Sequence, residues 1–551
     1  MGKEASAMVA RRSTSRRDWR RWWWWLLPLA CCFVCWVASS AATVAAAAGV
    51  AVTSLPGFDG PMPFSLETGD TRYGSQKHQY ANTASIYIYR TRLDRDRSRD
   101  KSIAQRAPLA EKATAYVEVN ESTGVRLFYY FVQSEKDPDV DPLLLWLSGG
   151  PGCSSLSGLT HEIGPFQFAA KRYYSGGLPK IIYQPETWTK VSNIIFVDSP
   201  VGAGFSYAAT QEGSKTSDTK TVKQLVIFLR KWLHDHPQFL LNPLYIGGDS
   251  YSGYIVPTLA LAIDESNDSG DKPILNLMYQ CGLQLTFAFH QFLYLVYMTQ
   301  GYVAGNPRTE RQFDEGGKIP FLHGMGLISN ELYECTKDIN MLHVLEPFCE
   351  DVGSPGIHNN EATDGMIRLM LESASAANDD IIEFKCRVEC IKTIQHYCIP
   401  LNSNLSKASY VVLQIWANDK TVRESLGVHK GTVGEWIRCN FDVDYIADVY
   451  STVEYHLTLM RKGYRALIYS GDHDCQVPFT GTQAWIRFLN LSVVDDWRPW
   501  YAAGQVAGFT RSYANNNLIY ATVKGAGHTA PEYKPKECLE MFARWISGNT
   551  L

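Results

Sequence analysis

Three residues whose types suit nucleophilic catalysis follow one another along the chain. Ser250 lies in the stretch GDSYSG, after a short apolar run and before a helix-like pattern. A serine hydroxyl is a weak nucleophile, so it needs an imidazole to accept its proton and a carboxylate to orient that imidazole. Asp474 and His528 come later, in that order, each in a loop that follows an apolar run. Together the three residues predict acyl transfer through a covalent acyl-enzyme.

The elements that must position these residues are short apolar runs that end in loop-forming residues. Such runs, bounded by glycine, indicate strands that are buried on both faces of a parallel sheet. They occupy residues 142–150, 193–200, 243–250, 465–474 and 517–528. A helical pattern over 220–237 lies between two of them. This alternation predicts an α/β fold with a mostly parallel central sheet, and the order serine, acid, histidine is that of α/β-hydrolases. Residues from about 310 to 410 break the rhythm and are predicted to form an inserted helical cap.

Two details of the predicted site depend on loop sequences. Asp472 is a rival to Asp474, and we prefer Asp474 because the turn G-x-x-D lets the side chain clear the end of the strand. The loop LSGGPGCSS, residues 147–155, follows an early strand and is rich in glycine. Glycine lets a backbone amide approach a substrate closely, and such amides stabilise the oxyanion of a tetrahedral intermediate. We therefore expect this loop to supply oxyanion donors, with a plain tight turn as the alternative.

The composition of the chain excludes some classes of function. The chain has 551 residues, of which 45% are hydrophobic and 20% charged, as in globular proteins. Its formal net charge is −4, so nothing favours a nucleic-acid partner. Cys386, Cys390 and Cys398 lack the CxxC pair that accompanies most structural zinc sites. We expect neither a metal nor another cofactor.

The N-terminus is typical of an exported protein. A basic region, an apolar stretch over 22–38 and small residues through Ala48 predict a signal peptide over residues 1–48, with an uncleaved membrane anchor as the alternative. Residues 49–551 would then form a single domain without a stable membrane anchor. Most of the remaining cysteines should pair in the secretory pathway, and the final location would be extracellular or vacuolar. Four N-x-S sequons fit glycosylation there, at Asn120, Asn267, Asn404 and Asn490.

Five long motifs resemble the plant serine carboxypeptidase-like family, peptidase family S10. They are LLLWLSGGPGCSSLSGLTHEIGPF, NIIFVDSPVGAGFSY, LYIGGDSYSG, LIYSGDHDCQVPF and GAGHTAPEYKP, and the resemblance runs from about residue 55 to 545 with two interruptions. It implies Ser250 as nucleophile, Asp474 as acid and His528 as base. It also implies oxyanion amides at Gly150 and Tyr251. The same resemblance implies a disulfide between Cys153 and Cys439.

The resemblance leaves the reaction open. Family members that are carboxypeptidases resemble one another in an Asn before the Gly-Gly, a Glu in the following helix and a Glu before the serine. This chain keeps Glu162 but has Ser148 and Asp249 at the other two positions, beside Gly149 as a further substrate-binding position. The exchanges weaken binding of a C-terminal carboxylate and resemble the acyltransferase branch.

Three hypotheses therefore remain. The first is an acyltransferase that passes an acyl group from a glucose ester to an alcohol acceptor. The second is a carboxypeptidase whose substrate is a peptide C-terminus. The third is a catalytically silent binding protein, which the complete set of triad residues disfavours.

Two stretches do not fit the family pattern, and a third is a candidate processing site. Residues 70–115 carry mixed charge and are interpreted as a solvated or disordered insert, with a basic interaction tail as the alternative. Residues 279–300 are long and apolar enough for a membrane helix, but a span there would separate Ser250 from Asp474. We predict that both are unspliced sequence or else surface loops. Residues 372–380 are a candidate site for excision into two chains, with a plain surface loop as the alternative.

Overall fold

The computed structural model describes nine segments of the chain. They are residues 49–52, 54–59, 62, 64–70, 116–169, 176–277, 301–335, 404–514 and 517–551. The predicted signal peptide, the excision site and nearly all of the two predicted inserts lie outside these segments.

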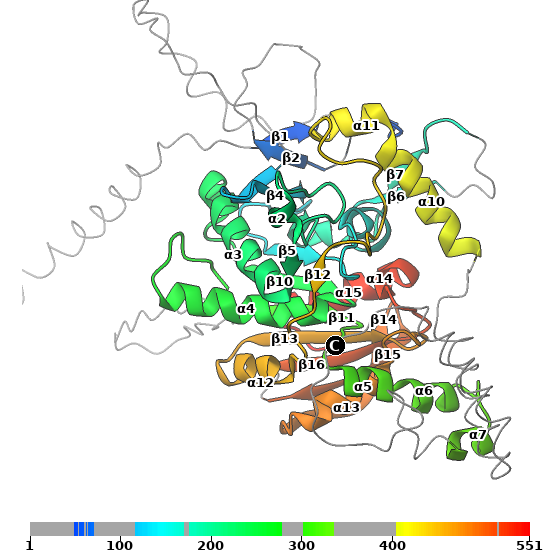
Figure 1. Ribbon diagram of the computed structural model, residues 1–551. Helices are drawn as coiled ribbons and strands as arrows, with labels where there is room; N and C mark the ends of the chain where they lie inside the picture. The colour runs from blue at the N-terminus through cyan, green and yellow to red at the C-terminus, as the bar shows by residue number, and fades with distance from the viewer. Residues whose placement is uncertain are drawn as a thin grey trace, which may run out of the picture. The chain divides into compact units, whose positions relative to one another are not determined.

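A sheet of 12 strands forms the centre of the described residues (Figure 1). Its six middle strands are parallel to one another, in the order β8, β5, β10, β11, β13, β16. Their bounds are β8 Asn193–Val197, β5 Leu143–Leu147, β10 Leu244–Asp249, β11 Gly301–Gly305, β13 Arg465–Gly471 and β16 Leu518–Val523. The five apolar runs contain five of these strands, so the expected mostly parallel sheet is confirmed.

Antiparallel strands extend the sheet at both edges. On the β8 side they are β4 Val125–Val132, β2 Leu66–Asp70 and β1 Gly49–Val52, with β3 Tyr116–Asn120 paired to β4. On the β16 side they are β15 Gln505–Tyr513 and β14 Val493–Ala502. Two small sheets are formed by β6 Phe166–Phe168 with β7 Ile181–Tyr183, and by β9 Thr216–Ser217 with β12 Tyr445–Ile446.

Helices α3 (Asp218–Asp235) and α4 (Ser252–Asp268) pack together on one face of the sheet (Figure 1). Helix α3 begins where the Ser217 hydroxyl accepts a hydrogen bond from the Lys220 N–H. Its buried side chains recur at helical spacing, for example Leu225, Leu229 and Trp232. The helix that the 220–237 pattern predicts is confirmed.

The middle strands bury both of their faces because side chains alternate along a strand. In β10, Tyr245 belongs to one core cluster and Ile246 to the other, which contains α3 and α4. The first cluster includes residues of helix α15 (Pro535–Ile546). There Phe542 stacks on Trp188, with the ring centroids 4.0 Å apart. These two cores fix the sheet whose strand ends carry the site.

The remaining helices are short connections and part of the predicted cap. They are α2 Gln211–Ser214, α5 Arg311–Gly316, α6 Lys318–Gly324, α7 Asn330–Cys335, α10 Asn404–Asn418, α11 Lys420–Ser425, α12 Val453–Arg461, α13 Phe479–Phe488 and α14 Ala530–Tyr533, with helical turns η1 Gly158–Glu162, η2 Trp188–Lys190 and η3 Pro237–Phe239. Within the predicted cap, the described residues are largely helical.

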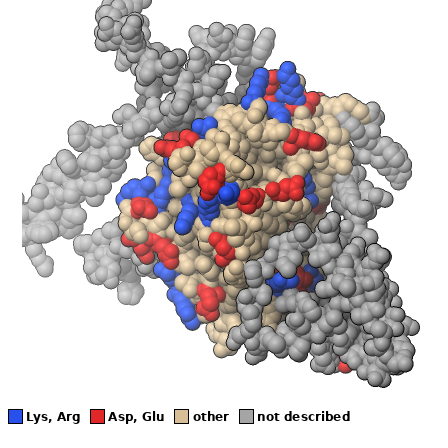
Figure 2. Space-filling model, in the orientation of Figure 1, with Lys and Arg blue, Asp and Glu red and all other residues tan. Residues whose placement is uncertain are grey.

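The described surface carries both signs of charge. Lysine and arginine side chains alternate with aspartate and glutamate over the face that Figure 2 shows. Across the described parts of the chain, every helix is too short or too polar to cross a bilayer.

Candidate active site

Ser250 lies on a sharp turn between strand β10 and helix α4. Its backbone adopts φ +56°, a conformation that is strained for a residue with a side chain. The turn needs small neighbours: a Cβ on Gly248 would lie 2.5 Å from the Leu147 carbonyl oxygen, and one on Gly253 would lie 2.2 Å from that of Arg308. This is the geometry of a nucleophile elbow, which exposes the serine hydroxyl at the end of a strand.

Ser252 occupies the position that is glycine in the G-x-S-x-G pattern. Its side chain is buried, and its hydroxyl donates to the Leu147 carbonyl oxygen at 3.2 Å. The serine is therefore accommodated by a hydrogen bond to the neighbouring strand, and Gly253 supplies the close approach that the turn requires.

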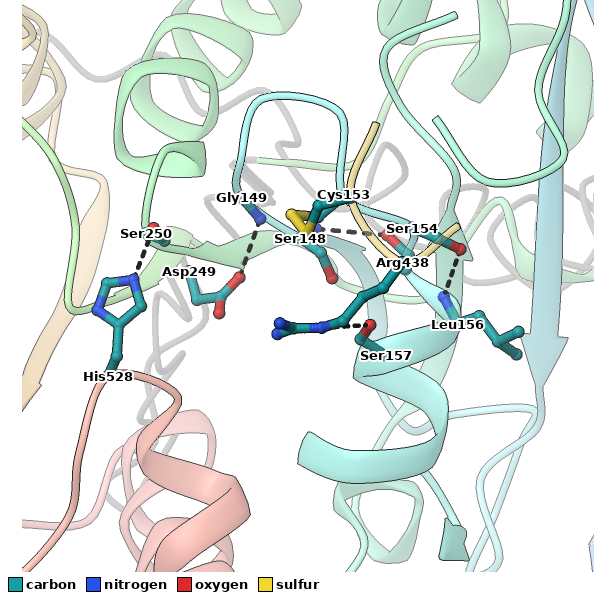
Figure 3. The surroundings of a disulfide bond; sticks show 12 residues. Ser148, Gly149, Cys153, Ser154, Leu156, Ser157, Asp249, Ser250, Arg438 and His528 are labelled. Carbon is teal, nitrogen blue, oxygen red and sulfur yellow. Dashed lines mark hydrogen bonds between the residues drawn. A yellow bond between two sulfur atoms is a disulfide. The ribbon is translucent and has the colours of Figure 1, made fainter. Parts of the chain in front are cut away.

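The structure brings the three predicted residues together. The strands β10, β11, β13 and β16 are parallel neighbours, so the loops that follow them meet at one edge of the sheet. His528 Nε2 lies 2.8 Å from Ser250 Oγ, and His528 Nδ1 lies 2.7 Å from Asp474 Oδ2. Figure 3 shows the imidazole facing the serine hydroxyl. This arrangement can pass the hydroxyl proton to Nε2 while the carboxylate holds Nδ1–H.

Asp474 is buried, yet its pKa lies below the usual range. Burial alone would raise it, but the charge and hydrogen bond of His528 outweigh burial. The carboxylate also accepts hydrogen bonds from Asn306 Nδ2 at 2.7 Å and from the backbone N–H groups of Gln476 and Val477. Asp474 is thus held ionised and oriented by four donors.

The pKa of His528 is shifted in the opposite direction from what burial predicts. Burial favours the neutral imidazole, but the Asp474 carboxylate and its hydrogen bond raise the pKa above the usual 6.5. Asp249 contributes in the same sense through its charge. The imidazole is therefore a stronger base than a free histidine.

Asp472 lies outside this chain of hydrogen bonds. Its carboxylate accepts from the Gly525 N–H and lies beside the ring of His473. The structure thus places Asp474 against His528, whereas Asp472, in the same loop, binds the backbone of Gly525.

The glycine-rich loop lies against the serine. A Cβ on Gly149 would lie 2.6 Å from Ser250 Cβ, so only glycine allows this approach. Gly150 has φ +118°, which side chains rarely adopt. Among the described residues, neither the Gly150 nor the Tyr251 N–H donates to a protein acceptor. Both amides are therefore available to a substrate oxygen.

Asp198 fixes the glycine-rich loop through hydrogen bonds to its backbone and side chains. Its buried carboxylate accepts from the Ser154 hydroxyl at 2.6 Å, the Ser155 N–H at 2.9 Å and the Phe205 N–H at 2.9 Å. Burial raises the pKa of Asp198 to about 6, against the lowering effect of these bonds. The donors bind a fixed acceptor, which preorganises the loop.

A disulfide joins Cys153 to Cys439, as the resemblance implied. It ties the glycine-rich loop to residues 439–449, which we call the strap. The Asn440 N–H donates to the Gly152 carbonyl oxygen at 2.9 Å beside it. The strap therefore begins at the loop that carries Gly150.

A cavity of about 520 Å³ opens at the serine. It is lined by residues that include Ser148, Gly149, Glu162 and Asp249, so all four predicted substrate-binding positions face it. Glu162 and Asp249 are both buried, with 5% of each residue exposed. Burial raises the pKa of both carboxyls, and the charge of Asp249 raises that of Glu162 further. A cation, Arg438, opposes both increases.

A sequence profile of the serine carboxypeptidase family matches residues 103–548. The chain belongs to the serine carboxypeptidase family. It is 41% identical over 500 residues to serine carboxypeptidase-like 7 of Arabidopsis thaliana, covering 91% of this chain and 94% of that protein. It is 40% identical over 517 residues to serine carboxypeptidase-like 13 of the same plant, covering 92% and 95%. This membership makes it a serine carboxypeptidase-like enzyme of the hydrolase type.

A solved structure supports the fold alone. A prohormone-processing carboxypeptidase from Saccharomyces cerevisiae superposes with a TM-score of 0.57, covering 79% of this chain and 90% of that chain at 17% identity. The expected α/β-hydrolase fold is confirmed by this likeness and by the parallel sheet.

Several residues of the cavity were missed by reasoning from the family motifs. Arg438 donates from Nε to the Ser157 hydroxyl at 3.3 Å, and its guanidinium lies 3.6 Å from the ring centroid of Tyr410. Figure 3 shows its side chain extending past Ser157 toward the side of the site that holds Asp249. Tyr410 in turn donates to Glu532 at 2.6 Å. No quoted motif contains Tyr410 or Arg438, which come from helix α10 and from the residue before the strap, whereas Glu532 lies within the motif GAGHTAPEYKP.

Asn306 was also missed, although a signal was present. It directly follows strand β11 in the stretch GYVAGNP, at the same sheet edge as the other loops. Polar residues at the carboxyl ends of parallel strands are common at sites of this fold.

The four sequons differ in their surroundings. Asn490 is exposed in a turn with φ +49°. Asn267 is partly buried, and its amide both donates to and accepts from the backbone of Leu275. Asn120 accepts from the Ser122 hydroxyl, and the side chain of Asn404 lies outside the described atoms.

Among the described residues, no group of histidine, cysteine or acidic side chains could hold a metal ion.

Proposed function

We propose that the protein is an acyltransferase that moves an acyl group from a glucose ester to an alcohol acceptor. The observation that carries this proposal is the hydrogen bonding of the Asp249 and Ser148 side chains beside Ser250. Asp249 Oδ1 accepts the Gly149 N–H at 3.2 Å (Figure 3). The Ser148 hydroxyl is buried and without a partner among the described residues. The short aspartate is thus engaged by the loop itself, and no side-chain amide stands at residue 148 to bind a C-terminal carboxylate.

The first half of the reaction makes the acyl-enzyme. Ser250 Oγ attacks the ester carbonyl carbon while His528 Nε2 takes the hydroxyl proton. The negative charge that develops on the carbonyl oxygen is stabilised by the N–H groups of Gly150 and Tyr251. The ester bond breaks, and glucose leaves with the proton from His528.

The second half transfers the acyl group. His528 Nε2 takes the proton of the acceptor hydroxyl, whose oxygen attacks the acyl carbon on Ser250. The intermediate collapses, the new ester leaves, and the proton returns to Ser250 Oγ. Asp474 remains ionised throughout and stabilises the imidazolium. Water and the alcohol compete for the same step, so the outcome depends on how the cavity holds the acceptor.

A second candidate, a serine carboxypeptidase, is favoured by a different observation. Glu162 and Asp249 are two buried acids in the cavity, and both have raised pKa values. Such a pair can share a proton with the carboxylate of a peptide C-terminus at acid pH. Arg438 supplies a cation to the same cavity, and a guanidinium binds carboxylates well. A peptide C-terminus would then take the place of the acceptor.

We also propose that the enzyme acts in the secretory pathway. The Cys153–Cys439 disulfide supports this, since disulfides persist in oxidising compartments. The signal peptide over 1–48, cleavage to a soluble form, glycosylation and excision near 372–380 remain predictions.

Two substrates separate the candidates. Purified protein is incubated with a hydroxycinnamoyl glucose ester and an alcohol, and separately with a blocked dipeptide at acid pH. The Ser250→Ala variant serves as the control for contaminating activity. Formation of the new ester by the unaltered protein alone supports the acyltransferase, whereas release of the C-terminal amino acid without ester transfer overturns it. If neither reaction occurs and a fluorophosphonate does not label Ser250, the protein is a silent member of the family.

A further inference from the structure

A buried carboxylate outside the cavity joins the serine turn to the strap. Asp218, the first residue of helix α3, has 0% of its surface exposed. Its Oδ1 accepts hydrogen bonds from the hydroxyl of Tyr251 at 3.0 Å and from that of Tyr445 at 2.6 Å. Its Oδ2 accepts from the Val449 N–H at 2.9 Å. Three donors from two separate segments therefore converge on one carboxyl group.

The two segments are those that shape the proposed oxyanion site. Tyr251 directly follows Ser250, and its backbone N–H is one of the two proposed oxyanion donors. Tyr445 and Val449 belong to the strap, whose first residue is bonded to Cys153 in the glycine-rich loop. The strap is fixed again beside Asp218, because Thr219 donates from its N–H and its hydroxyl to Asp448 at 2.9 and 2.6 Å.

Stability alone is a poor explanation for this arrangement. Burying a carboxylate costs free energy, and packed apolar residues usually stabilise a core at least as well. Within the described segments, no lysine or arginine forms an ion pair with Asp218. The carboxylate is instead satisfied by hydroxyl and amide donors, and hydrogen bonds to a charged acceptor are directional. Such a group can fix the orientation of what it binds.

We propose that Asp218 is a positioning residue for the oxyanion site. Through the Tyr251 hydroxyl it holds the residue that supplies one oxyanion amide. Through Tyr445 and Val449 it anchors the strap that leads to the loop carrying the other amide. Asp218 itself does not line the cavity at Ser250. The inference rests on the proposed role of Ser250 and Tyr251, and it holds for an acyltransferase and a peptidase alike.

Two matched variants test the proposal with a single oxygen atom removed in each. Tyr251→Phe removes the bond between Asp218 and the serine turn but keeps the ring that packs against Tyr254 and Tyr445. Tyr445→Phe removes the bond between the same carboxylate and the strap. Each variant is assayed for melting temperature, for the rate of Ser250 labelling by a fluorophosphonate, and for kcat and KM with a simple ester.

We expect Tyr251→Phe to slow labelling and lower kcat by roughly tenfold while KM changes little, because small displacements of a catalytic group are costly. Tyr445→Phe should label within about twofold of the unaltered enzyme, since the Tyr251 bond remains and the Val449 and Asp448 bonds still anchor the strap. Asp218→Asn should slow labelling as Tyr251→Phe does, and adding Tyr251→Phe to it should cause no further loss, as expected for two groups that act through one bond.

Labelling of the unaltered enzyme tests the role of Ser250, and the variants test the role of Asp218. If the unaltered enzyme is not labelled, the proposed role of Ser250 fails. If it is labelled and Tyr251→Phe matches it in labelling rate and kcat, the role of Asp218 fails, whatever happens to the melting temperature. Equal loss in both tyrosine variants also overturns the proposal, because the Val449 and Asp448 bonds still hold the strap when the Tyr445 hydroxyl is removed, so loss of that hydroxyl alone should matter little.

Discussion

Replacing Asp474 by asparagine is predicted to remove nearly all activity. The carboxylate accepts four hydrogen bonds: one from His528, one from Asn306, and two from the backbone at Gln476 and Val477. An asparagine has one acceptor oxygen, so either orientation of its amide turns an NH2 group toward an existing donor. If the NH2 group faces His528, Nδ1 must become the acceptor and the proton moves to Nε2, where it can no longer accept from Ser250.

The magnitude follows from these contacts. A wrong imidazole tautomer in a serine triad lowers kcat by about ten-thousandfold, which is roughly 5 kcal/mol of transition-state stabilisation. The donor left unpaired in the buried site should also cost about 1–3 kcal/mol in the free energy of unfolding. Because the pKa of Asp474 is lowered in the folded state, the stability it contributes is present above its unfolded value of 3.8 and is lost as the pH falls through the folded pKa.

The assay is the rate of ester turnover by Asp474→Asn, with the melting temperature measured on the same sample. Asp472→Asn is the matched control, since it makes the same chemical change two residues away in the same loop. The control should keep activity within a few fold. Retention of more than a tenth of kcat by Asp474→Asn, or a large loss in the control, would refute the assignment of the acid.

Three further predictions concern pH, the glycine-rich loop and glycosylation. The plot of kcat/KM against pH should rise through the pKa of His528, above 6.5, because the neutral imidazole is the base. The charge of Asp249 raises this pKa, so in Asp249→Asn the rise should move to lower pH. Gly149→Ala should slow fluorophosphonate labelling by about a hundredfold, because the new Cβ would lie 2.6 Å from Ser250 Cβ; labelling at the original rate would contradict this. Asn490, exposed in its turn, should carry a glycan, and Asn490→Gln should remove one glycan mass from the secreted protein, whereas an unchanged mass would show the sequon to be empty.

Much of the fold was predictable because the middle strands are apolar along their whole length. Runs such as that ending at Ser250 can be recognised without knowledge of their neighbours, and they proved to be parallel strands. The antiparallel edges were not predicted. Strand β14 mixes exposed and buried side chains irregularly, and its pairing with β15 contains register shifts. Its period-2 pattern is therefore too weak to read from the sequence.

The residues of the site were likewise predictable from the sequence only in part. Ser250, Asp474 and His528 lie in loops directly after apolar strands, so order and spacing were enough to select them. Arg438 and Asp218 reach their positions only through tertiary contacts. A charged residue in an irregular segment, or at the start of an amphipathic helix, looks the same in sequence whether it faces solvent or a buried partner.

The central claim is that Ser250 carries the acyl group between an ester and an alcohol. The enzyme is mixed with a hydroxycinnamoyl glucose ester without acceptor, quenched in acid and digested, and the peptide that contains Ser250 is weighed by mass spectrometry. We predict that this peptide gains the mass of the acyl group, and that adding the alcohol before the quench removes this mass and yields the new ester. An unmodified peptide while the ester is consumed, or acyl loss to water alone in the presence of the alcohol, would contradict the claim.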